Sequence, residues 1–335
     1  MRRLRVAIVG CGKMGREHAR AARALGADVT WTCDAEISRA IDLSRGYRCT
    51  ATVAAEDIDW ASLDAVFVCT PPFARGPVER RAITARVPFF VEEPIGLSAE
   101  EATAVLRALR DAPIIHSVGY MFRYRRSVLE ARARLEGSRI LGASCAWVGK
   151  IYGRPWWLDP RGSGGPFNEQ ATHLVDLCRF LVGEIVEVTA IGIRSLAQVD
   201  IEDTVVVAFR LQGGAGGTLL YSCLGTDKEI GLEVFSSAGR VRLEGWDLRP
   251  SGGNPGGGNM EDEEDVFELE AAAFFEAIKA RDQGLVLCDL EDAVRTQRVV
   301  DAIRRSARTG RPELVASLHG GEDSARAKEA IIRSR

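Results

Sequence analysis

The stretch RVAIVGCGKMG, residues 5–15, constrains the fold of this chain more than any other. A short β-branched run leads into Gly10, Gly12 and Gly15 with the spacing G-x-G-x-x-G, and an amphipathic pattern then continues to about Leu25. In a dinucleotide-binding unit, the first glycine permits a tight turn, the second lets backbone N–H groups approach a pyrophosphate, and the third lets the helix pack on the strand. A plain glycine-rich turn is the alternative. We expect the loop to bind a dinucleotide through Gly10, Gly12, Lys13, Met14 and Gly15.

An acidic residue follows the loop at the distance that such a unit requires. A second strand, predicted over residues 29–33, ends at Asp34, where a carboxylate accepts hydrogen bonds from ribose hydroxyls. The same carboxylate repels a 2′-phosphate, and no arginine follows it until Arg39. The sequence therefore predicts NAD as the cofactor, with NADP less favoured.

Strands and helical patterns alternate through the first third of the chain. Further strands are predicted over residues 65–69 and 88–91, which indicates a doubly wound parallel sheet of the Rossmann type. Ligands of such sheets bind beyond the carboxyl ends of the strands. Thr70 and Pro71 in CTPPF, and Glu92 in FFVEEP, are therefore expected to face the cofactor. This NAD-binding domain is predicted to span residues 1–119.

The pattern changes after residue 119. A helix over residues 127–137, a strand over 140–151 and a helix from about 168 to 183 precede five closely spaced strands between residues 187 and 245. Such a run predicts a large, mostly antiparallel open sheet, so the chain is an α/β protein with an α+β second domain over residues 120–316. A glycine-rich and acidic surface loop is predicted over 249–265, closing helices over 266–280 and 289–307, and a tail over 317–335.

Composition limits the classes of partner. The formal net charge is −3 over 335 residues, so no global field recruits nucleic acid or an anionic membrane. The eight cysteines are scattered without a C-x-x-C pair, which indicates free thiols in a reducing compartment rather than disulfides or a metal site. No apolar run is long enough to span a membrane, and the first strand begins too early to leave room for a cleavable signal. We expect a cytoplasmic protein with a small-molecule partner.

The glycine loop, the acid after the second strand, the T-P-P motif and the E-x-P strand end together resemble the Gfo/Idh/MocA oxidoreductase family, which contains inositol and sugar dehydrogenases. The resemblance spans about residues 4–314. In that family the last motif usually reads Glu-Lys-Pro, and its lysine serves in proton transfer near the nicotinamide. This chain has Glu93 there, and Arg75 stands where relatives commonly carry histidine. The resemblance also implies a homodimer or homotetramer that pairs through the second sheet.

The helical pattern over residues 169–181 carries the second half of the expected chemistry. His173 lies four residues after Glu169 and three before Asp176, so the three side chains are expected on one helical face. The resembling family has a glycine pair followed by D-x-x-x-H-x-x-D, in which the histidine assists proton transfer and the first acid touches substrate hydroxyls. The resemblance implies that His173, Glu93 and Glu169 are the catalytic residues, and an imidazole pKa near 6.5 suits acid–base work. A structural role for His173 is the alternative.

Other residues are candidates for substrate contacts. Tyr120 lies at the domain junction, and Lys150 lies at the end of a strand that leads into the loop with Trp156. The aromatic faces of Trp156 and Trp157 could cover the C–H surface of a sugar ring, although packing under the loop is equally compatible. The expected substrate contacts are Tyr120, Lys150, Trp156 and Asp176.

Three functions are compatible with these features. The leading hypothesis is an NAD-dependent oxidoreductase that acts on a secondary alcohol or ketone of a sugar, cyclitol or amino sugar by hydride transfer at nicotinamide C4. Burial and repulsion by Glu92 should raise the pKa of Glu93 and keep it usable as an acid or base. The alternatives are a redox-neutral enzyme that retains NAD, and a non-catalytic protein that binds NAD or a sugar because the usual lysine is Glu93.

Overall fold

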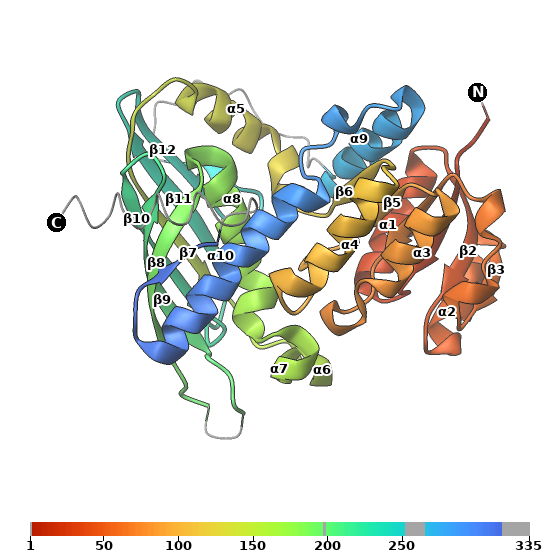
Figure 1. Ribbon diagram of the computed structural model, residues 1–335, viewed down its shortest axis with the longest axis horizontal. Helices are drawn as coiled ribbons and strands as arrows, with labels where there is room; N and C mark the ends of the chain where they lie inside the picture. The colour runs from red at the N-terminus through yellow and green to blue at the C-terminus, as the bar shows by residue number, and fades with distance from the viewer. Residues whose placement is uncertain (1, 197–198, 252–264, 317–335) are drawn as a thin grey trace.

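The computed structural model describes residues 2–196, 199–251 and 265–316. Two sheets lie side by side, and a long helix near the end of the chain, α10 (Leu290–Thr309), runs between them (Figure 1). It packs on α4 (Ala99–Asp111) beside the first sheet and on α8 (Thr172–Val182) and β8 (Ile185–Ile193) of the second. The two units are therefore joined by a shared helix as well as by the connecting chain.

The first sheet is parallel and has the strand order β3-β2-β1-β4-β5-β6 in the described part of the chain. The order reverses direction between β1 and β4, so the carboxyl ends of these strands flank the crevice in which such sheets bind their ligands. This confirms the predicted doubly wound sheet. Its elements are β1 (Arg5–Val9), α1 (Lys13–Ala24), β2 (Asp28–Cys33), α2 (Ile37–Tyr47), β3 (Thr50–Thr52), β4 (Ala65–Val68), α3 (Pro77–Ala85), β5 (Phe89–Val91), α4 and β6 (His116–Val118).

A helix from far along the chain covers one face of the first sheet. Helix α9 (Val266–Ala280) packs against α1, and Phe274 and Ala271 from α9 are fully buried in the same core cluster as Phe67 of β4 and Phe90 of β5. Asp265 begins this helix, because its side chain accepts hydrogen bonds from the first free backbone N–H groups. The region around residues 1–119 thus shares its core with residues 266–280.

The second sheet is mostly antiparallel, as predicted, with the order β13-β12-β11-β7-β10-β9-β8-β14 in the described residues. Only the pairing of β10 with β7 is parallel there. Helices α5 (Arg126–Leu135), α8 and α10 pack against one face and form the second core. The strands are β7 (Ile140–Val148), β8, β9 (Thr204–Leu211), β10 (Gly216–Ser222), β11 (Glu229–Ser236), β12 (Gly239–Glu244), β13 (Arg249–Pro250) and β14 (Glu313–Leu314).

The opposite face of the second sheet presents an apolar row. Strand register places Ile191 beside Val206, Val206 beside Leu220, and Leu220 beside Ala146. Ile191 is 65% exposed, Val206 42% and Leu220 39%. Apolar side chains that line up on an uncovered sheet face are typical of a surface that meets another protein surface. We call these four residues the outer apolar row.

The tail predicted over residues 317–335 and most of the loop predicted over 249–265 lie outside the described residues. Within the residues that are described, no helix is both long and apolar enough to cross a membrane. The described residues include all eight cysteines, which carry free thiols.

Candidate active site

The loop between β1 and α1 is shaped by its glycines. Gly10 has a φ of +93°, and a Cβ built there would lie 2.5 Å from the Cys69 carbonyl group. A Cβ at Gly15 would lie 1.9 Å from the Gly10 carbonyl oxygen, whereas one at Gly12 would meet no atom within 4 Å. Two of the glycines are therefore required by close packing, and the third leaves the start of α1 accessible. A pyrophosphate fits this cradle of backbone N–H groups.

Asp34 is fixed against the same loop. Its Oδ2 accepts a hydrogen bond from the Cys11 N–H at 2.7 Å, and its Oδ1 accepts one from the Glu36 N–H at 2.9 Å. The carboxylate thus lies at the end of β2 and beside the glycine loop, where an adenosine ribose is recognised in this fold. Thr70, at the end of β4, has a buried hydroxyl with no hydrogen-bond partner among the described residues. This orphaned group and the glycine cradle fit a bound dinucleotide.

The other cofactor candidates surround this loop. Lys13 is the first residue of α1 and is exposed, Met14 follows it and is half-buried, and Pro71 is half-buried after β4. Arg75, which follows the T-P-P motif, donates a hydrogen bond from Nη1 to the Val68 carbonyl oxygen at 2.5 Å. Burial lowers the pKa of Arg75, and the nearby charges of Glu79, Glu92 and Glu93 oppose that change. Arg75 therefore offsets carboxylates at the edge of the first sheet.

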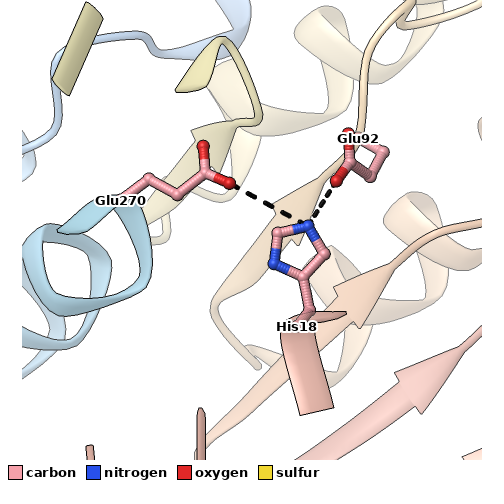
Figure 2. Close-up of side chains that lie close together, drawn as sticks. All are labelled: His18, Glu92 and Glu270. Atoms are coloured by element: carbon pink, nitrogen blue, oxygen red, sulfur yellow. Dashed lines mark hydrogen bonds and ion pairs between the residues drawn. The ribbon is translucent and has the colours of Figure 1, made fainter. Parts of the chain in front are cut away.

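Glu92 turns away from Glu93 and into the interior. Its Oε1 is hydrogen-bonded to Nε2 of His18 from α1, and Oε1 of Glu270 from α9 lies 4.0 Å from the same nitrogen (Figure 2). All three side chains are buried, and their ligand atoms lie within 4.8 Å of one another, a distance compatible with metal ligation. His18 and Glu92 bond each other directly, so the arrangement in the structure is a hydrogen-bonded pair with the Glu270 carboxyl group beside it. Glu92, a predicted cofactor contact, thus has an interior partner at its Oε1.

Glu270 is the member of this cluster that makes no hydrogen bond with its side chain. Neither of its carboxyl oxygens has a hydrogen-bond partner among the described residues. Burial, and then the negative charges of Glu92 and Glu93, raise the pKa of Glu270 well above its usual 4.5. The folded protein therefore favours the neutral form of this side chain.

Glu93 and His173 meet where the two domains join. Oε1 of Glu93, just after β5, lies 3.1 Å from Nε2 of His173 in α8, and the side chains are 10% and 11% exposed. Burial raises the pKa of Glu93 although His173 opposes this. The pKa of His173 is also raised, because the charge and the hydrogen bond of Glu93 outweigh the opposing effect of burial. The structure thus brings together the two motifs from which the site was predicted.

Each side chain of this pair has a second buried polar atom that is not hydrogen-bonded within the described residues. Oε2 of Glu93 and Nδ1 of His173 have no hydrogen-bond partner among the described residues. If Nε2–H of His173 donates to Glu93, Nδ1 retains a lone pair that can accept a proton. The arrangement is therefore that of a base held in one tautomer by a carboxylate.

Glu169 lies close to the pair but in a different local structure from the one expected. It belongs to a π-helical turn, Phe167–Ala171, that precedes α8 and changes the phase of the helix by its wider spacing. Trp157 donates from Nε1 to Oε2 of Glu169 at 2.6 Å. Burial, followed by repulsion from Glu93, raises the pKa of Glu169 to about 7. Glu169 can therefore exchange a proton near neutral pH.

Asp176 does not share this environment. Its carboxylate accepts hydrogen bonds from Arg123 at 2.6 and 2.7 Å and from the Thr296 hydroxyl at 2.9 Å. Asp176 is only 2% exposed, and Thr296 belongs to α10. The side-chain hydrogen bonds of Asp176 within the described residues thus go to Arg123 and Thr296, and not to Glu169 or His173. Its observed contacts join α8 to α10.

The remaining substrate candidates occupy different positions. The Tyr120 hydroxyl lies 2.8 Å from the Thr172 hydroxyl, and its buried ring meets the His173 ring edge-on at 6.4 Å between centroids. Trp156 is half-buried and packs against the second core, and Trp157 is fully buried, which supports the packing alternative for these tryptophans. Lys150 is exposed, with Nζ 3.8 Å from an Asp227 carboxyl oxygen. Of these residues, Tyr120 is the one in contact with the Glu93–His173 pair.

Sequence reasoning missed the groups that the second sheet contributes. Trp147 of β7 stacks on His173, with 5.6 Å between ring centroids and 5° between planes. Phe122 packs on both His173 and Trp246. Lys228, in the loop before β11, holds Nζ 3.6 Å from the Trp246 ring centroid and 4.6 Å from that of Trp147. The scarcity of lysine in an arginine-rich chain was the one signal that could have singled out Lys228.

Comparison with known proteins agrees with this geometry. Residues 4–120 match the oxidoreductase family with an NAD-binding Rossmann fold, and residues 129–242 match the Gfo/Idh/MocA C-terminal domain. Inositol 2-dehydrogenase of Rhizobium meliloti (strain 1021) is 28% identical over 254 residues, covering 72% of this chain and 76% of that protein. Myo-inositol dehydrogenase Hyg17 of Streptomyces leeuwenhoekii is 30% identical over 254 residues, covering 73% and 72%.

A solved structure shows the same fold over nearly the whole chain. The WlbA dehydrogenase from Bordetella pertussis, in complex with NADH and UDP-GlcNAcA, superposes with a TM-score of 0.84 at 22% identity, covering 94% of this chain and 100% of that one. The two family matches together cover both halves of the chain and include the glycine loop, Glu93 and His173. The chain belongs to the Gfo/Idh/MocA family of NAD-binding oxidoreductases.

Proposed function

We propose that this protein is an NAD-dependent dehydrogenase that acts on a secondary alcohol of a cyclitol or sugar, with the Glu93–His173 pair as its acid–base group. The observation that carries the proposal is the 3.1 Å contact between these side chains at the carboxyl ends of the first sheet. When bound, NAD supplies the hydride acceptor at nicotinamide C4.

The side chains of the site would accept the substrate hydroxyl proton and return it in the reverse reaction. Oxidation of the alcohol removes a hydride from carbon and a proton from oxygen, which leaves a carbonyl group. His173 receives the hydroxyl proton, and the adjacent Glu93 carboxylate stabilises the imidazolium that results. In the reverse direction, the same imidazolium returns the proton to the oxygen of the reduced ketone. The parallel contact with Trp147 supports the orientation of the imidazole ring.

A neutral polyol is the substrate class that this site favours. Two buried carboxyl groups, Glu93 and Glu169, disfavour a further anionic group nearby. A carboxyl group with a pKa of about 7 can donate or accept a hydrogen bond with a substrate hydroxyl. The relatives named as inositol dehydrogenases support a cyclitol as the first choice.

The outer apolar row supports a second part of the proposal, that subunits pair through the second sheet. Ile191, Val206 and Leu220 would be removed from water if two such sheets packed face to face. A homodimer formed in this way would leave the Glu93–His173 pair unobstructed, because that pair lies on the helix-covered side of the sheet with α8.

The test is incubation of the purified protein with NAD and a panel of cyclitols, sugars and amino sugars, followed by NADH absorbance and by mass spectrometry of the products. His173→Ala should lower kcat by about 10²–10⁴-fold without changing NAD affinity. His116→Gln, which changes a histidine in β6, is the matched control. Full activity of the His173 variant would overturn the acid–base assignment.

Glu93→Lys separates the proposal from its two alternatives. Turnover by the native protein would establish a dehydrogenase that works with a glutamate at this position. Activity in the lysine variant alone would show that the native chain has left dehydrogenase chemistry. A product isomerised or hydrolysed without accumulation of NADH would identify a redox-neutral enzyme.

A further inference from the structure

The described residues provide no ion-pair partner within 4.0 Å for Lys228, and its charge acts on His173. Its Nζ lies over the faces of Trp246 and Trp147, at 3.6 and 4.6 Å from the ring centroids. The Trp147 ring in turn lies parallel to the His173 imidazole. Two indoles therefore hold the ammonium group, and one of them also stacks on His173, although Lys228 as a whole is exposed.

The charges that act on Lys228 come from two parts of the fold. Glu169, from the turn before α8, favours the charged ammonium, and Lys13, from the glycine loop, disfavours it. Burial of the ammonium end among its neighbours has the largest effect and lowers the pKa of Lys228. Together with the two charges, it brings this pKa to about 8. The charge of Lys228 also opposes protonation of His173, whereas Glu93 and Glu169 favour it. Lys228 is therefore coupled to both the cofactor loop and the acid–base group.

The chemistry of alcohol oxidation requires such a charge. When the hydroxyl proton passes to the Glu93–His173 pair, negative charge develops on the substrate oxygen before the C–H electron pair has left as hydride. Two carboxyl groups nearby, Glu93 and Glu169, make that charge unfavourable. Arg75 is a cation that acts on Glu93, but its Nη1 donates a hydrogen bond to the Val68 carbonyl oxygen within the first domain.

We propose that Lys228, held over Trp147 and Trp246, is the cationic group of the site and stabilises the negative charge that develops on the substrate oxygen. The inference rests on the proposed dehydrogenase function. It assigns to the β10–β11 loop a charge that position 93, occupied by glutamate, does not provide. The loop belongs to the second sheet, so the charge would reach the substrate from the side opposite the cofactor domain.

Steady-state kinetics of Lys228→Met, Lys228→Arg and Lys279→Met test this proposal with the alcohol that the native protein oxidises. Removal of one group that stabilises a developing oxyanion lowers kcat by about 10²–10³-fold, so we expect this loss in Lys228→Met with little change in KM. Lys228→Arg should retain more activity because the charge remains. Lys279 is an exposed lysine near the end of α9, and its variant should match the native protein. A kcat within threefold of native in Lys228→Met would overturn the proposal.

The pH dependence distinguishes a charged role from a structural one. Native kcat should decline as Lys228 loses its proton near pH 8, and this decline should be absent in Lys228→Arg, whose guanidinium stays charged. Added ethylamine should restore part of the activity of Lys228→Ala. A loss of kcat in Lys228→Met with neither the altered pH profile nor amine rescue would assign Lys228 to packing and refute the proposal.

A readout without substrate completes the test. Tryptophan fluorescence of the native protein should change near pH 8, because the ammonium lies against two indoles, and the change should disappear in Lys228→Met but persist in Lys279→Met. Absence of this transition would remove the geometric basis of the inference. Failure of the native protein to oxidise any alcohol would instead refute the proposed function, and with it the role of Lys228 in that reaction.

Discussion

Replacement of Asp34 by asparagine should greatly reduce the ability of the protein to distinguish NAD from NADP. In the native protein both carboxylate oxygens of Asp34 accept backbone hydrogen bonds, at 2.7 and 2.9 Å, so the negative charge is held at one place beside the glycine loop. Two unit charges about 4 Å apart repel by about 1 kcal/mol in water and about 4 kcal/mol at an effective dielectric constant of 20. A ribose hydroxyl bonded to a carboxylate contributes about 1.5–3 kcal/mol.

These magnitudes predict a preference of about 2.5–7 kcal/mol, or at least about 60-fold in the ratio of dissociation constants. Asparagine removes the charge but keeps one carbonyl oxygen for the loop, so Asp34→Asn should bind NAD about tenfold more weakly and prefer it by less than tenfold. Fluorescence titration of native and variant protein with NAD, NADH, NADP and NADPH measures both changes. Equal affinity of the native protein for the two oxidised cofactors, or an undiminished preference in the variant, would refute the reasoning.

Three further predictions concern other parts of the molecule. Glu93→Gln should lower the pKa of His173, because burial is then the largest remaining effect on that pKa. NMR titration of the histidine ring protons measures the change, and an unchanged midpoint would show that the contact is absent. Because burial raises the pKa of Glu270 in the folded protein, the free energy of unfolding should fall as pH rises above about 4.5, by at most about 1.4 kcal/mol per pH unit. Glu270→Gln should remove that fall. Urea titrations at pH 5 and pH 8 measure the free energy of unfolding, and a variant that lost as much of it between the two pH values as the native protein does would contradict this. Val206→Arg places a charge in the outer apolar row and should dissociate the proposed dimer, which light scattering would detect as a halved mass.

Local patterns were sufficient to predict the first sheet, whereas the pairing of its motifs with α8 depended on the family resemblance. The glycine spacing, the β-branched run before it and Asp34 belong to one contiguous unit, so the physics that decides their arrangement is visible within about 30 residues. Glu93 and His173 are 80 positions apart, and the family resemblance, rather than periodicity, brought them together. The structure places their side chains 3.1 Å apart.

Other contacts could not be predicted because they depend on register and on competition for partners. Trp147, Lys228 and Trp246 come from a strand and two turns, and the pairing of β11 with β7 brings Ile230, two residues after Lys228, opposite Trp147. Helical spacing alone placed Asp176 with His173, but Arg123 offered that carboxylate two hydrogen bonds elsewhere. Periodicity gives the direction of a side chain, and the partner that it meets is decided by the rest of the fold.

The packing of α9 on α1 has consequences for the synthesis of the protein and for truncated forms of it. The chain leaves the ribosome from its amino end, so the aromatic face formed by Phe67 and Phe90 is without its cover until residues 266–280 have been synthesised. A fragment that stops at the end of β6 would contain every cofactor-binding motif and yet expose this apolar surface to water. Expression of the nucleotide-binding half for study would therefore require α9 to be joined to it by a linker, and nascent chains shorter than about 280 residues are the stage of synthesis at which aggregation has to be prevented.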